Sequence, residues 1–162
     1  MVHNLDPRAA RVLAEAVEDP DFTERAVPLH DGGTMYTRKA GAGVVAFEIK
    51  DDTGRVTTHG GTHAEGSTRG AEYPSDWPFI SELSSFHSVL EGKRSVFWVH
   101  DVPESTLYHR IRRELIQSGW SEDAAGRSES AFTTTSKFTR GANAVTLSRF
   151  AYLGQTVLTL ME

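Results

Sequence analysis

The fold is decided by residues 95–120, SVFWVHDVPESTLYHRIRRELIQSGW, because they join an apolar strand to a helix with recognisable ends. Residues 96–99 form a continuous apolar run, which is typical of a central strand covered on both faces. Apolar residues then recur at helical spacing, at Leu107, Tyr108, Ile111 and Leu115. This pattern predicts an amphipathic helix over about 102–118.

Both ends of this helix carry sequence signals. Asp101, followed three residues later by Glu104, resembles a capping box, and Pro103 falls in the first turn, where its missing N–H does no harm. Gly119 suits a left-handed C-terminal cap, and Trp120 stands where such a cap places an apolar contact. We therefore expect a well-capped helix.

Strand-like segments lie on both sides of the helix. Before it, segments 44–50 and 55–58 and segments 83–90 and 95–99 are each separated by a short turn that contains glycine, which predicts two hairpins. After it, a polar linker over 121–129 leads to segments 131–139, 143–152 and 156–161, which predict a C-terminal meander. The expected fold class is α+β, with a mainly antiparallel sheet and the helices on one face.

The N-terminal segment 1–30 predicts a peripheral helix. Asp6 and Pro7 can open it, Asp19 and Pro20 can end it, and its apolar stripe is rich in alanine. Residues 59–70 contain four glycines and no apolar residue larger than alanine, which predicts a flexible loop. A length of 162 residues is ordinary for one domain, so we expect a single domain over 1–162.

The composition limits which classes of partner and site are expected. A formal charge of -5 repels phosphate backbones, so nucleic acid is not expected as a partner. The absence of cysteine excludes disulfides and thiolate metal sites. No apolar run is long enough to predict a membrane span or an export signal, and the compartment stays open between the cytoplasm and export of a processed chain.

His59 and His63 raise the question of a metal site, since they lie four residues apart with Glu65 nearby. That spacing places two rings on one face only in a helix, and Gly60 and Gly61 argue against a helix. The two histidines are therefore weak candidates, and the sequence predicts no metal and no cofactor.

No catalytic constellation can be assembled. His100 and Asp101 could pair as a base and its orienting carboxylate, but Asp101 is already explained as a helix cap. An arginine cluster at Arg110, Arg112 and Arg113 fits a solvated helix face. Enzyme activity therefore stays open and is not favoured.

Three aromatic residues in a proline-rich stretch are the candidate binding residues. Trp98 and Trp120 fit core positions, whereas Trp77 stands between Asp76 and Pro78 in a loop-like segment that also contains Tyr73 and Phe79. Exposed aromatic side chains are common anchors at protein interfaces. We expect Trp77, Tyr73 and Phe79 to contact a protein partner.

A wider pattern carries a resemblance. It runs through Tyr73-Pro74, Tyr108, Leu115, Gly119-Trp120, Phe138 and Gly154-Gln155-Thr156. Over about residues 73–160 the chain resembles small, largely uncharacterised bacterial α+β domains of exported proteins or lipoproteins with a helix ending in Gly-Trp. The resemblance assigns no catalytic residue and implies an accessory or binding role.

Three functions follow as hypotheses. The first is a non-enzymatic protein-interaction or accessory module of a bacterial assembly, which docks through a sheet edge or through Trp77. The second is a small ligand-binding protein or enzyme with a pocket near His100, Asp101 and the 59–70 loop. The third is a structural subunit of a larger assembly. The sequence does not indicate the partner or the oligomeric state.

Overall fold

A computed structural model describes residues 6–100, 106–152 and 154–162 of the chain. Ten strands form one sheet in the order β1-β2-β3-β4-β5-β6-β10-β9-β8-β7, and every neighbouring pair is antiparallel. The elements are α1 (Pro7–Glu18), β1 (Glu24–Pro28), β2 (Thr34–Gly41), β3 (Val44–Lys50), β4 (Val56–His63), β5 (Ser84–Leu90), β6 (Lys93–His100), α2 (Thr106–Gln117), β7 (Ser121–Glu129), β8 (Thr133–Arg140), β9 (Asn143–Tyr152) and β10 (Gln155–Met161). The predicted α+β class with a mainly antiparallel sheet is confirmed.

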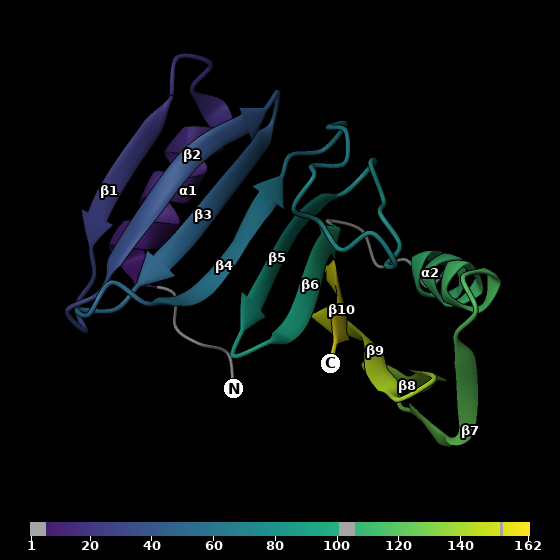
Figure 1. The fold of residues 1–162 in the computed structure, drawn as a ribbon. Coiled ribbons are helices and arrows are strands. Elements are labelled where there is room, and N and C mark those ends of the chain that lie inside the picture. Colours follow the sequence, from purple (N-terminus) through teal and green to yellow (C-terminus); the bar gives the residue numbers. More distant parts are fainter. Residues whose placement is uncertain (1–5, 101–105, 153) are drawn as a thin grey trace.

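The C-terminal meander joins the first block of strands through β10, which pairs with β6. The twisted sheet runs across the whole molecule in Figure 1, with α1 behind β2 and β3 and α2 at the other end beside β7. Neither helix of the described part of the chain is long and apolar enough to cross a membrane.

The two helices pack on opposite faces of the sheet, which corrects the expectation that they share one face. Residues directly opposite each other in neighbouring strands share a face, and Val45, Thr62, Phe86 and Phe97 form such a row across β3 to β6. The row begins under α1, because Val45 packs in the same hydrophobic cluster as the helix. Trp98 follows Phe97, points to the other face and packs with α2.

Helix α1 has a hydrophobic core of its own and is not peripheral. Ala9 and Ala16 are fully buried, and the helix packs on β1 to β4. Small alanine side chains allow the helix to lie close to the sheet, so the thin stripe indicated close packing rather than a marginal position. Its N-cap is Asp6, whose side chain accepts a hydrogen bond from Arg8 N–H at 2.9 Å.

The second helix ends with two hydrogen bonds beyond its last turn. Gly119, at φ 91°, donates its N–H to Ile116 O at 3.1 Å, and the Trp120 N–H donates to Leu115 O at 3.1 Å. The Trp120 side chain is buried in the same cluster as Leu115. The capping box expected at Asp101 and Glu104 lies outside the described residues.

Residues 59–63 belong to β4, so the prediction of a flexible loop over 59–70 is wrong for its first half. Gly60 and Gly61 stand where neighbouring backbone comes too close for a side chain. A Cβ at Gly60 would lie 2.0 Å from His87 O, and one at Gly61 would lie 2.6 Å from Val45 O. These glycines permit tight strand packing, and the sequence rule that associates glycine with mobility does not apply.

Residues 121–129 form the edge strand β7, where the sequence predicts a polar linker. Its pairing with β8 is interrupted between Asp123 and Ser128, and most of its side chains are exposed. A strand without a buried face shows no apolar alternation, which explains why the prediction failed. The opposite edge, β1, was also missed and ends at Pro28.

Candidate functional site

The predicted aromatic binding residues lie inside the protein. Residues 64–83 form a loop, here called the covering loop, that packs onto the α2 face of the sheet. Tyr73 and Trp77 are only 2% and 3% exposed, and Phe79 is partly buried against the same core. The Tyr73 hydroxyl donates a hydrogen bond to Pro78 O. The expected exposed aromatic surface is therefore not present.

Charged residues hold the covering loop in place. The Arg94 guanidinium lies 4.6 Å from the centre of the Trp77 ring and pairs with Asp76 at 2.7 Å and Glu162 at 2.6 Å. Arg140 also contacts Asp76, at 3.1 Å. Asp76, the charged neighbour that made Trp77 look exposed, thus pairs with arginines from distant strands, and Arg94 covers the buried ring.

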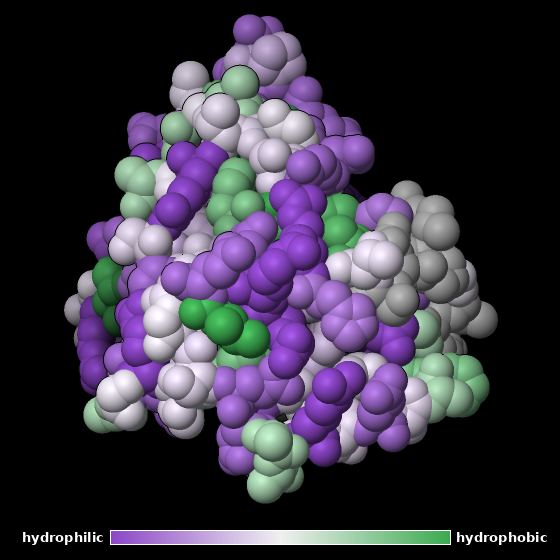
Figure 2. All heavy atoms as spheres, turned by 90° about the vertical axis from the view of Figure 1, so that its right-hand side faces the viewer, coloured by the Kyte–Doolittle hydropathy of each residue, from purple (hydrophilic) through white to green (hydrophobic). Residues whose placement is uncertain are grey.

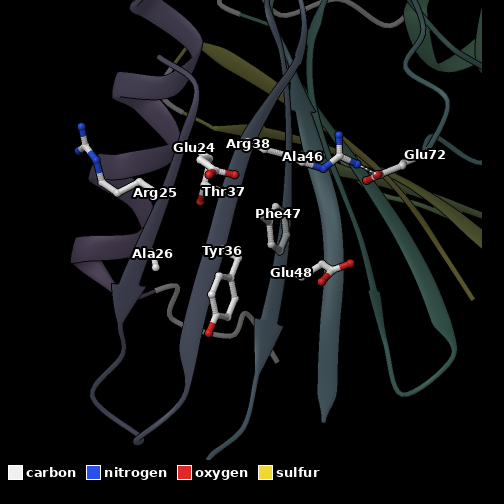
Figure 3. Close-up of a pocket in the computed structure, with 10 residues that line it drawn as sticks. All are labelled: Glu24, Arg25, Ala26, Tyr36, Thr37, Arg38, Ala46, Phe47, Glu48 and Glu72. Carbon is white, nitrogen blue, oxygen red and sulfur yellow. Dashed lines mark hydrogen bonds and ion pairs between the residues drawn. The ribbon is translucent and has the colours of Figure 1, made fainter. Parts of the chain in front are cut away.

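A groove of about 470 Å³ lies on the face of the sheet opposite α1. Figure 3 shows its residues on β1, β2 and β3, with Arg25 pointing away towards α1, where it pairs with Glu15 at 2.7 Å. Tyr36, which is 45% exposed, stands beside Glu48 on the neighbouring strand. The groove thus combines charged side chains with apolar ones, and Tyr36 is its most exposed aromatic ring.

Charges in the groove are unevenly compensated. Arg38 forms an ion pair with Glu72 of the covering loop. Glu24 is the cross-strand partner of Arg38, and neither Glu24 nor Glu48 forms an ion pair among the described residues. Acidic charge is therefore in excess around Arg38.

A smaller recess of about 120 Å³ adjoins the groove beneath the covering loop. Arg38, Ala46 and Glu72 line both hollows, so the ion pair stands at the mouth of the recess. The recess is also lined by two buried histidines, His63 and His87, whose ring centres lie 5.5 Å apart.

The two histidines have few hydrogen-bond partners. His63 Nε2 accepts a hydrogen bond from the Gly70 N–H at 2.8 Å. His63 Nδ1 and both nitrogens of His87 have no partner in the described structure. Burial lowers the pKa of His63, and burial together with the nearby His63 and His59 lowers the pKa of His87 to about 4. Both rings are therefore neutral at pH 7.

The structure does not bring the weak metal candidates into a ligand set. His59 lies on β4 with an exposed side chain, whereas His63 is buried four residues further along the strand. Within the described ranges, no group of three or more His, Asp or Glu side chains is placed to hold a metal ion.

The remaining candidates lie apart from both hollows. His100 is at the end of β6 and lines neither one, and Asp101 lies outside the described residues. In the arginine cluster, Arg110 pairs with Glu82 at 3.3 Å, and Arg112 pairs with Glu122. These arginines are used in ion pairs with neighbouring elements.

The C-terminal half of the sheet has a face that neither helix covers, here called the open face. It consists of alternate residues on β6, β10, β9 and β8: Ser95, Phe97, Val99, Val157, Thr159, Met161, Thr146, Ser148, Phe150, Thr133, Thr135 and Lys137. Lys93, at the start of β6, and Lys137 are the charged residues of this alternate set, and Asp123 of β7 lies opposite Lys137. The other face of the same strands packs against α2.

The apolar side chains of the open face reach solvent. Val99, Phe150 and Met161 are 45%, 42% and 42% exposed, and Phe97 and Val157 are partly exposed. Val99, Val157 and Phe150 are successive cross-strand neighbours, so they form one continuous row. By contrast, Figure 2 shows the end of the molecule with α2 and β7 as mostly hydrophilic, with hydrophobic residues in separate spots.

Sequence reasoning missed His87 and the open face. A signal for the open face exists in β10, where both alternating sets of residues are uncharged from Thr156 to Met161. Such a strand needs cover on both faces, and among the described residues one helix, α2, packs on that half of the sheet. No comparable signal marks His87, because its burial depends on the covering loop.

Comparison of the chain with protein-family models, with curated proteins and with solved structures found no match.

Proposed function

We propose that the chain is a non-enzymatic protein-interaction module whose open face docks onto a partner protein. The observation that carries the proposal is the continuous row of exposed apolar side chains, Val99, Val157 and Phe150, on a face almost without charge. An exposed apolar patch on a soluble domain commonly marks an interaction surface. The likeness to domains of exported bacterial proteins, which implies a binding role, agrees with this proposal.

The chemistry of the open face defines the partner surface. Between the exposed apolar side chains lie small hydroxyl residues: Ser148 and Thr159 are already buried, and the Ser148 hydroxyl forms a hydrogen bond with that of Thr135 at 3.3 Å, so a partner would contact mainly the apolar side chains around them. A charged partner surface would lose its water here without gaining an opposite charge, except beside Lys93 and Lys137. We therefore propose a partner with an apolar, uncharged surface.

Edge pairing is the less favourable mode of docking. One edge, β1, is five residues long and ends in proline, and the other, β7, is irregularly paired and carries Glu122, Asp123, Arg127 and Glu129. Short, charged and interrupted edges are features that discourage strand addition. The proposal therefore assigns docking to a face of the sheet.

The third hypothesis, a structural subunit of a larger assembly, is the second candidate. An almost uncharged face can pack against its own copy without repulsion between like charges. Sedimentation velocity over a hundredfold range of concentration separates the two. If the chain forms a dimer and Phe150→Lys abolishes it, the open face serves self-association. If the chain is a monomer at every concentration, the open face is assigned to another protein.

Site-specific photo-crosslinking tests the proposal. A photoreactive phenylalanine analogue replaces Phe150 in one variant and Ile116 in a matched control, since these side chains are 42% and 43% exposed. Ile116 lies on α2, away from the open face. We expect one defined crosslinked protein from position 150 in source cells and none from position 116. Equal crosslinking from both positions, or none from position 150, contradicts the proposal.

A further inference from the structure

The recess beneath the covering loop has a hydrogen-bonding pattern that specifies a ligand group. It lies on the face of the sheet opposite to the open face, so ligand binding here is independent of docking at the open face. His63 and His87 are 1% and 3% exposed, and buried polar groups in proteins normally have hydrogen-bond partners. Three of their four ring nitrogens have no partner in the described structure.

The Gly70 hydrogen bond fixes the tautomer of His63. A ring nitrogen that accepts a hydrogen bond carries no proton, and His63 Nε2 accepts from the Gly70 N–H. The proton of the neutral ring therefore lies on Nδ1. This N–H donor belongs to a residue in the wall of the recess, is closed off from solvent and has no acceptor, so a ligand reaches it only when the covering loop shifts outward.

His87 supplies the complementary partner. Its neutral ring has one donor nitrogen and one acceptor nitrogen, and both lack partners. A ligand group that accepts from His63 and also donates to His87 would satisfy both rings. A primary carboxamide has this combination, because its oxygen accepts and its NH₂ group donates.

Two other ligand groups, a carboxylate and a metal ion, fit the recess less well. A carboxylate would lose its water in the recess without gaining a free cation, because Arg38 at the mouth is already paired with Glu72. A metal ion would find only one unprotonated ring nitrogen in the pair, that of His87, because the free nitrogen of His63 carries the proton. An uncharged ligand group meets neither obstacle.

Size and lining agree with a small amide. A volume of about 120 Å³ equals the share of roughly four water molecules in the liquid, which suits a group of a few heavy atoms. The remaining walls include Ala40, Val44, Ala46 and Gly61. These walls can contact the hydrocarbon part of the ligand.

We propose that this recess binds a primary carboxamide, either a small free amide or the side chain of Asn or Gln in a partner chain. His63 Nδ1–H donates to the amide oxygen, and the acceptor nitrogen of His87 receives the amide N–H. The Arg38–Glu72 pair forms the mouth of the recess.

Imidazole nitrogen NMR on the purified, unaltered chain tests the proposal. The free chain should show His63 with an unprotonated Nε2. Acetamide and propionamide are titrated beside their charged counterparts, acetate and propionate. We expect saturable shifts at His63 and His87 with the amides and at least about tenfold weaker binding of the acids. Acids that bind as well as the amides, or no saturable shift with any amide, overturn the proposal.

A matched pair of variants locates the effect. His87→Phe keeps an aromatic ring but removes both nitrogens, and His59→Gln changes an exposed histidine that does not line the recess. We expect about tenfold weaker amide binding for His87→Phe and no change for His59→Gln. Unchanged binding by His87→Phe overturns the proposal. Backbone amide spectra of both variants verify folding, and the comparison of amides with acids needs no variant.

Two peptides distinguish the sources of the amide. Gly-Gln-Gly and Gly-Glu-Gly differ only in a side-chain amide against a carboxylate. Shifts at His63 and His87 with the Gln peptide alone indicate the side chain of a partner protein. If free amides bind but the Gln peptide does not, the ligand is a small molecule.

Discussion

Gly60 shows at the residue scale how closely the centre of the sheet is packed. A Cβ there would lie 2.0 Å from His87 O and 2.8 Å from Ser88 Cα, both of them backbone atoms. Backbone cannot rotate away as a side chain can, so β4 and β5 would have to separate. The approach of these strands therefore depends on the absence of a side chain at position 60.

We expect Gly60→Ala to lower the free energy of unfolding by roughly 3 kcal/mol, the upper end of the usual cost of overpacking. Gly126→Ala is the control, because its Cβ would meet only the side chain of Lys137, at 3.0 Å, on an edge strand. Urea denaturation measures both. A cost for Gly60→Ala no larger than that for Gly126→Ala would show that the strands do not approach so closely.

The buried histidines make stability depend on pH. Burial and the nearby His63 and His59 lower the pKa of His87 from its ordinary value of 6.5 to about 4 in the folded chain. Between these values the unfolded chain binds more protons than the folded chain. Stability is therefore complete above about pH 6.5 and falls as the pH approaches 4.

For His87 alone the expected loss is up to about 3 kcal/mol, because each tenfold difference in proton affinity between the folded and unfolded chains corresponds to about 1.4 kcal/mol. His87→Phe should flatten the decline between pH 6.5 and 4 but not abolish it, since burial also lowers the pKa of His63. Thermal unfolding across this range measures the effect. An identical pH dependence in the variant would mean that His87 is not buried in the neutral form.

At the scale of elements, helix α1 is attached to the sheet through its C-terminal carbonyls. Lys39 on β2 donates from Nζ to Ala16 O at 2.8 Å and to Val17 O at 3.3 Å. A cation at this end also interacts favourably with the helix dipole. The contact therefore fixes α1 over the hydrophobic core that the helix shares with the N-terminal strands.

We expect Lys39→Met to destabilise the fold by about 1 kcal/mol, because it leaves these carbonyls without their charged donor. Lys93→Met provides the control, since Lys93 is exposed at the start of β6. Chemical denaturation compares the two variants. Equal stability of both proteins would indicate that the lysine contributes nothing to the attachment of α1.

The sequence predicted elements where one face is apolar and failed where burial depends on distant parts. The run 96–99 and the helical stripe around Ile111 predicted a strand and a helix that the structure contains. Strand β7 was missed because its polar side chains show no alternation. The start of β4 was predicted as the segment 55–58, but its residues 59–63 were placed in a loop because Gly60 and Gly61 pack against backbone that the local sequence does not reveal.

The candidate sites were predicted less well than the fold. Trp77 was expected outside because its neighbours are Asp76 and Pro78, yet Arg94 from β6 covers its ring. His63 was considered only as a metal ligand, and its neighbour His87 went unnoticed. Both errors concern contacts between segments far apart in the chain, and a single sequence does not specify such contacts.

At the scale of the whole molecule, the helices lie on opposite faces and at opposite ends of one continuous sheet. Each half therefore has one covered face and one face that needs other cover. In the N-terminal half, the face opposite α1 carries the groove, and the covering loop closes part of it. In the C-terminal half, the face that needs other cover is the open face, and its low charge distinguishes it from the groove.

Phe150→Lys should leave the stability of the isolated chain within about 0.5 kcal/mol, because the side chain is exposed and away from either core. It should also weaken binding of the partner at least about tenfold, because a lysine in the interface would be buried without an opposite charge. Ile116→Lys should alter neither quantity. Calorimetry with the crosslinked partner measures the affinities, and unimpaired binding by Phe150→Lys would place the interface elsewhere.

The most direct test of the central claim, that the open face is covered in the functional state, is hydroxyl-radical footprinting read by mass spectrometry. The purified chain is compared with the chain in extract of its source cells. Oxidation of Met161 and Phe150 should fall several-fold in the extract, while Tyr36 and Ile116, of similar exposure on other surfaces, react as before. Unchanged oxidation of Met161 and Phe150, or equal protection of all four residues, would contradict the account.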